Sequence, residues 1–184
     1  MKDAVKSLLE DDHESLGRLL DELDAELRKP DIAAFLKLLD LFWARLAVHI
    51  RAENLHLFPA LTGAFPSFFT GEGNLPTTDE AHSIILRLRA DHSDFMRELA
   101  SIMNAARESV EQKSASPENI SEWRQVLTSI SKRLDAHNRL EEEQVYLWPS
   151  ILFDEKTVAS LRTRIRHELQ NLPPRLASEL QVVP

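Results

Sequence analysis

The chain has 184 residues, a formal net charge of −8 at pH 7 and no cysteine. This length fits one compact domain with a short extension, and the lack of cysteine excludes disulfides, thiolate zinc sites, iron–sulfur ligation and cysteine nucleophiles within the chain. The acidic balance argues against a nucleic-acid partner, because affinity for phosphate comes chiefly from clustered Lys and Arg.

Four segments carry apolar side chains at alternating steps of three and four residues, the spacing of core positions in an antiparallel helix bundle. Each stripe also contains a histidine. In chain order the stripes are His13, Leu16, Leu20, Leu23, Leu27; Phe35, Leu39, Phe42, Leu46, His49, Glu53, His56; Ile85, Leu88, His92, Phe95, Leu99, Ile102; and Trp123, Leu127, Ile130, Leu134, His137, Glu141. The pattern predicts an all-α fold, an antiparallel up-down four-helix bundle over residues 1–152.

Helix boundaries follow from proline, glycine and capping residues. Lys29-Pro30-Asp31 separates the first helix from the second, and Ser116-Pro117 opens the fourth. Residues 61–78 are rich in Gly and Pro and predict the longest loop, which ends in a capping box at Thr77–Glu80 that opens the third helix. We expect three aromatic residues in this loop to plug the bundle end, with a lid or a partner surface as the alternative: Phe65, Phe68 and Phe69.

The last segment repeats the helical periodicity on a smaller scale. Apolar residues recur at helical spacing between positions 158 and 169, and three arginines lie between them. We expect residues 153–184 to form a short additional C-terminal helix and tail, packed on or beside the bundle. Residues 158–169 are also the predicted contact for a homodimer or a protein partner.

The motif His-x-x-x-Glu occurs twice, as His49–Glu53 and as His137–Glu141, and each copy runs into an aromatic-Pro pair. Residues four apart lie on one face of a helix, about 6 Å from each other. One imidazole and one carboxylate from each of two helices can therefore converge on the same pair of cations. His13 and His92, on the other two stripes, complete the set.

A lone histidine in a core is more often a hydrogen-bonded structural residue than a metal ligand. A buried ionised glutamate is different, because it costs several kcal/mol unless it is paired or bound to a metal. Two such glutamates, each one turn after a histidine, favour a metal site. The predicted ligands are His13, His49, Glu53, His92, His137 and Glu141.

With these residues the chain resembles the hemerythrin-like (HHE cation-binding) domain family over about residues 5–152. The resemblance includes His49–Glu53 followed by Leu57-Phe58-Pro59, close to the signature of that family. It implies a non-haem centre of two iron ions, oxo- or hydroxo-bridged and carboxylate-bridged. The six residues named above would hold it, with Glu53 and Glu141 as the bridges. Zinc or manganese are alternative metals.

Several positions depart from the oxygen-carrying members of that family. These have a second histidine one turn from the third-helix histidine, where this chain has Leu88 and Met96. One metal ion would therefore gain water or another ligand. His56 remains on the predicted inner face, where it would ligate the metal, hydrogen-bond to a ligand, or cap the core.

The second motif is followed by a longer spacing than the first, with eight positions from Glu141 to Pro149 against six from Glu53 to Pro59. Glu142 is therefore an alternative ligand to Glu141, which we prefer because it stays on the apolar stripe. His82 and His167 are placed outside the site.

The predicted site has few carboxylates and should favour binding O2, NO or peroxide over hydroxylating strong C–H bonds. We expect a protein that binds or senses such a molecule, or holds iron, and is not an enzyme. The alternatives are a di-iron enzyme or repair factor, which reduces peroxide or NO or supplies iron to iron–sulfur clusters, and a zinc-loaded or metal-free interaction module. No apolar run reaches about 18 residues and no secretory signal opens the sequence, so we expect a cytoplasmic protein without a membrane partner.

Overall fold

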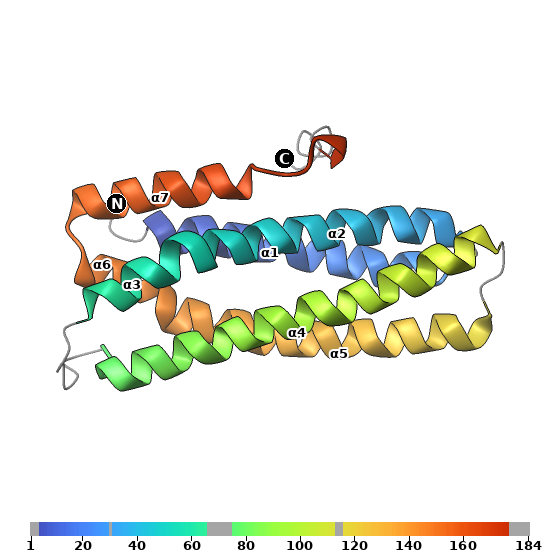
Figure 1. The fold of residues 1–184 in the computed structure, drawn as a ribbon, viewed down its shortest axis with the longest axis horizontal. Coiled ribbons are helices and arrows are strands. Elements are labelled where there is room, and N and C mark those ends of the chain that lie inside the picture. The colour runs from blue at the N-terminus through green and yellow to red at the C-terminus, as the bar shows by residue number, and fades with distance from the viewer. Residues whose placement is uncertain (1–3, 30, 66–74, 113–115, 177–184) are drawn as a thin grey trace.

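Four long helices lie side by side and form the body of the protein (Figure 1). The structure, a computed structural model, describes residues 4–29, 31–65, 75–112 and 116–176. The long helices are α1 (Ala4–Glu26), α2 (Ile32–Ala52), α4 (Thr78–Glu111) and α5 (Pro117–Glu143). The predicted all-α bundle is confirmed. None of the described helices combines the length and apolarity that crossing a bilayer requires.

Each long helix after the first begins at a side chain that caps its free backbone N–H groups. Asp31 accepts a hydrogen bond from the Ala34 N–H, and Ser116 accepts one from the Asn119 N–H. The predicted capping box is confirmed, because the Glu80 N–H donates to Thr77 while the Glu80 carboxylate accepts from the Thr77 N–H. These caps fix where α2, α4 and α5 start, and so set the heights of their histidines in the bundle.

The apolar stripes face inward and form two core clusters along the bundle. On α1, Leu9 belongs to one cluster and Leu16 to the other, and on α4 the same is true of Leu88 and Phe95. His13 and His92 therefore lie in a polar layer between two apolar cores. Water is kept out of this layer from both sides.

Both motif helices change their geometry close to the glutamate, at Glu53 in the first motif and within four residues of Glu141 in the second. α2 continues as the π-helix η1 (Glu53–Leu57) and then as α3 (Phe58–Ala64), while α5 is followed by the 3-10 helix η2 (Val145–Leu147) and by α6 (Trp148–Leu152). The prolines of the two aromatic-Pro pairs lie in the first turns of α3 and α6. Proline is tolerated there because its missing N–H would have no partner within the helix.

The predicted loop over residues 61–78 is wrong at its start, since Leu61–Ala64 belong to α3 and Phe65 is the C-cap of that helix. Phe65 is buried and packs edge-on against Trp148, with ring centroids 5.4 Å apart. This residue does close the end of the bundle. Phe68 and Phe69 lie outside the described residues.

The last helix, α7 (Glu155–Leu169), lies along α1 and α2 on the outside of the bundle (Figure 1). Its apolar stripe is buried against them. Glu168 is also buried, and its Oε1 lies 2.6 Å from the Arg51 guanidinium on α2. The apolar side of the segment is therefore used within the chain, and a homodimer or partner contact through residues 158–169 stays a prediction.

Ile165→Ala should lower the free energy of unfolding by about 2–5 kcal/mol, because the Ile165 side chain is fully buried between α7 and the bundle and its truncation leaves a cavity. Urea denaturation measures the change. Arg164→Ala, on the exposed side of the same helix, is the matched control and should stay within about 0.5 kcal/mol of the unchanged protein. Equal small effects of both changes would mean that α7 is not part of the cooperative fold.

Candidate metal centre

Four histidines meet at one level of the bundle, in two pairs. His13 from α1 and His49 from α2 bring their Nε2 atoms within 3.1 Å of each other. His92 from α4 and His137 from α5 do the same at 3.0 Å. All four side chains are buried. The four predicted histidines thus converge in space, with one pair supplied by each half of the chain.

Glu53 links the two pairs. Its Oε2 lies 3.5 Å from His49 Nε2 and 3.3 Å from His92 Nε2. The residue begins the π-helix η1 and is completely buried. A carboxylate in this place contacts both halves of the histidine layer, which is the placement that a bridging ligand needs.

Glu141 does the same from the opposite motif. Its Oε2 lies 3.4 Å from His13 Nε2 and its Oε1 lies 3.2 Å from His137 Nε2. Within the described ranges, two groups of residues could hold a metal ion, each with its donor atoms within 4.8 Å of one another: His13, His49 and Glu141, and His92, His137 and Glu141. The geometry offers two neighbouring cation positions that share Glu141.

Two of the carboxylate oxygens fit a cation better than they fit the protein around them. Among the described residues, neither Glu53 Oε2 nor Glu141 Oε1 has a hydrogen-bond partner, although both are buried. Buried oxygens without a donor are costly. Metal ions would use these lone pairs, so the donor set fits bound cations.

Asp12 fixes the orientation of His49, a role that the sequence analysis missed. His49 Nδ1–H donates to Asp12 Oδ2 at 2.9 Å, and Arg45 donates to Asp12 Oδ1 at 2.7 Å. Burial opposes the charge of Asp12, but His49 and Arg45 outweigh it and lower the pKa of this carboxyl. The tautomer that results leaves the Nε2 lone pair free for a metal.

Glu142, the alternative ligand, lies on the outer side of the histidine layer. Its Oε1 is 2.7 Å from His13 Nδ1, while Glu141 faces inward. Asp91 holds the corresponding position on His137, with Oδ2 3.3 Å from Nδ1. Like Asp12, these carboxylates accept from the outer nitrogen and aim the inner one at the cluster.

His92 is held by an amide where the other three histidines have carboxylates. Asn54 Nδ2 lies 3.4 Å from His92 Nδ1, and Asn54 Oδ1 has no hydrogen-bond partner among the described residues. Turning the amide by 180° lets Oδ1 accept from His92 Nδ1–H and frees the Nε2 lone pair. The outer support of His92 is neutral in either orientation.

Tyr146 is the residue at the centre that the sequence analysis did not find. It is buried in η2, and its hydroxyl donates to Glu53 Oε1 at 2.6 Å and lies 3.1 Å from Glu141 Oε2. Burial and the charges of the two glutamates raise the pKa of the phenol well above its usual value. One signal was available, because Tyr146 follows Glu141 by five positions, as the aromatic Phe58 follows Glu53.

His56 turns away from the cluster and pairs with α7. Its Nε2 lies 3.8 Å from Glu168 Oε2. The expectation that it stays on the inner face assumed a regular α-helix, whereas the wider turn of η1 shifts every residue after Glu53 around the helix axis. His82 lies near the start of α4, and His167 is exposed on α7.

Without metal, protons hold the cluster together. Burial opposes protonation of His13, but Glu141 and Glu142 outweigh it and raise the pKa of His13 to about 10. Burial likewise opposes the charge on Glu141, yet His137 and His13 bring the pKa of this carboxyl well below its usual value. Positive charge is therefore required between the glutamates whether or not a metal ion supplies it.

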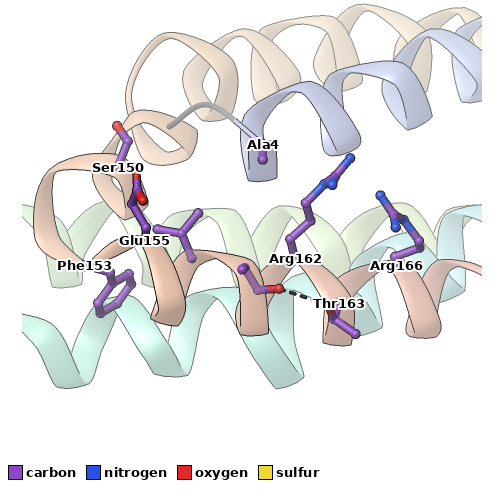
Figure 2. Close-up of a pocket in the computed structure, with 9 residues that line it drawn as sticks. Ala4, Ser150, Phe153, Glu155, Arg162, Thr163 and Arg166 are labelled. Atoms are coloured by element: carbon purple, nitrogen blue, oxygen red, sulfur yellow. Dashed lines mark hydrogen bonds between the residues drawn. The ribbon is translucent and has the colours of Figure 1, made fainter. Parts of the chain in front are cut away.

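A separate cavity of about 180 Å³ lies between α7, α6 and the start of α1 (Figure 2). Its lining includes Ser150, Phe153, Arg162 and Arg166, and Figure 2 shows both arginines extending from α7 toward α1. None of the six predicted ligands lines it. The histidine cluster is thus not part of this cavity.

The comparisons with known proteins agree with this geometry at the level of the family. No curated protein and no solved structure matches the chain. Residues 4–148 match the family described as Hemerythrin HHE cation binding domain, a range that contains all six predicted ligands. The chain therefore belongs to the hemerythrin HHE cation-binding domain family.

Proposed function

We propose that this cation-binding protein holds two iron ions and binds or senses O2, NO or peroxide at them, or holds the iron itself. The observation that carries the proposal is the placement of both buried glutamates between two pairs of histidines. Each glutamate has oxygen atoms near both pairs. A single-ion site would not need two carboxylates that each reach both halves of the bundle.

His13 and His49 would hold one ion, and His92 and His137 the other, with Glu53 and Glu141 shared between them. A pair of iron ions, when bound, supplies reversible electron exchange with a small oxidant or diatomic molecule. The protein supplies four nitrogen donors, two carboxylates and a dry surrounding. With two histidines and two shared glutamates, each position has fewer donors than the six of an octahedral ion, which leaves room for an exogenous ligand.

The burial of the cluster supports a small ligand. All six predicted ligands are 5% exposed or less, and apolar clusters lie on both sides of them. The ring of Phe58 stacks on His92, with centroids 5.9 Å apart and planes 11° from parallel. Molecules of two to four atoms fit such surroundings better than an organic substrate does.

Protein expressed in iron-replete medium should contain about two iron ions per chain, and Glu53→Gln should lose at least one of them, because an amide is a weaker and neutral ligand. Metal analysis and the visible charge-transfer spectrum measure this. Glu143→Gln is the matched control, since Glu143 is exposed and should keep the full iron content. One zinc ion per chain, unaffected by Glu53→Gln, would instead favour an interaction module.

Metal binding should strengthen as the pH rises, because protons occupy the cluster of the metal-free protein. The pKa of His13 is raised from 6.5 to about 10 in the folded state. Protonated His13 therefore stabilises the metal-free fold fully below pH 6.5, and this contribution is lost as the pH rises through about 10. Metal affinity should increase over the same window, since His13 must lose its proton to bind a cation.

Titration with a divalent metal at several pH values measures the affinity, and denaturation of the metal-free protein measures the stability. His13→Gln should weaken both pH dependences. A metal-free protein that becomes more stable across this window would contradict the assignment of the proton to His13.

Azide or NO added to the iron-loaded protein should shift its charge-transfer spectrum, because each ion retains open positions. The shift should be reversed when the ligand is removed. Stopped-flow absorbance follows both directions. Consumption of many equivalents of peroxide or NO per chain, with an electron donor supplied, would show an enzyme in place of a binding or sensing protein.

A further inference from the structure

The hydroxyl oxygen of Tyr146 has only ligand atoms of the proposed centre as its described hydrogen-bonding neighbours. It lies 2.6 Å from Glu53 Oε1, 3.1 Å from Glu141 Oε2 and 3.1 Å from His13 Nε2. Metal–ligand bonds of about 2.1 Å at right angles place neighbouring ligand atoms about 3 Å apart. The distances from the Tyr146 oxygen to these three atoms are therefore close to those between neighbouring ligand atoms around one metal ion.

The two motifs provide an internal comparison. Phe58 and Tyr146 each follow the motif glutamate by five positions, and each ring lies against a histidine of the opposite helix pair, His92 or His13. Both rings are buried. A phenylalanine fills this place in the first motif, so packing does not require a hydroxyl there. The hydroxyl of Tyr146 in the second motif therefore needs another explanation.

We propose that Tyr146 is a metal ligand of the ion held by His13 and His49, binding through its phenolate oxygen. This inference rests on the proposed metal centre. The phenol O–H bond breaks as the oxygen–metal bond forms, and the proton passes to water. Tyr146 then loses its hydrogen bond to Glu53, and the cation lies between the phenolate oxygen and the carboxylates of Glu53 and Glu141. The positive charge of the cation offsets the repulsion between these oxygens.

The phenolate makes the two metal positions unequal. The position at His13 and His49 has five protein ligands, and the outer nitrogens of both histidines face carboxylates at 2.7 and 2.9 Å. The position at His92 and His137 has four ligands, with Phe58 beside it and the neutral Asn54 behind His92. The more anionic position stabilises the ion of higher charge, and the exogenous ligand binds at the other ion.

The chain contains one tyrosine, so any tyrosine signal from the metal centre belongs to Tyr146. The test is resonance Raman spectroscopy on iron-loaded, air-oxidised protein, excited in the visible band and prepared with ordinary or ring-deuterated tyrosine. The proposal expects phenolate ring modes that shift with the deuterated label. Tyr146→Phe should lose these modes and the visible band, and should release one proton fewer per chain on metal binding.

Glu143→Gln is the matched control, because Glu143 is exposed and is not among the described contacts of Tyr146; its label-sensitive modes should persist. Circular dichroism and metal analysis of each variant establish that it is folded and loaded. Iron-loaded wild-type protein without label-sensitive modes overturns the proposal and leaves Tyr146 as a hydrogen-bond donor only. A folded wild-type protein that takes up no iron overturns the proposed function instead, so the two failures are distinguishable.

Discussion

The interior of the bundle is organised around two carboxylates that cannot be charged there without positive charge beside them. Glu53 and Glu141 are completely buried at the level where two apolar cores meet. Removing a charge from water without a partner costs several kcal/mol. His13 and His137, whose pKa values are raised, meet that demand as protonated side chains, and cations held by the cluster would meet it in their place. Neighbouring residues then fix the histidines: carboxylates and an amide on their outer nitrogens, with Arg45 behind Asp12.

The way each motif helix ends is as important as the motif itself. A continuous α-helix would carry its side chains past the cluster in regular register. The π-helix η1, which begins at Glu53, and the 3-10 helix η2, which begins four residues after Glu141, each interrupt that register. As a result Phe58 and Tyr146 lie over the cluster, while His56 faces Glu168 on α7. The irregular backbone near each motif therefore determines which further side chains face the histidine cluster, in addition to the ligands themselves.

Helical periodicity predicted the bundle and which six side chains would converge, and the capping residues Thr77 and Ser116 predicted where two of its helices begin. It predicts which face of a regular helix a residue occupies, and Leu16, Phe95 and their stripe neighbours obey it. It does not predict Asp12, Asn54 or Asp91, which reach the histidines from the edges of the stripes. Nor does it extend beyond Glu53 and Glu141, where the helices stop being regular, and for that reason Tyr146 was missed. That the six residues ligate metal stays a prediction.

The division of the histidines between the two halves of the chain has a mechanical consequence. His13 and His49 belong to the first pair of helices, and His92 and His137 to the second, so neither pair holds all six donors. Ions shared through Glu53 and Glu141 would tie together segments separated by more than a hundred residues in sequence. Such ties lower the entropy of the unfolded chain most when the loops they close are long. In a chain without cysteine, the metal centre would act as the cross-link that a disulfide supplies elsewhere.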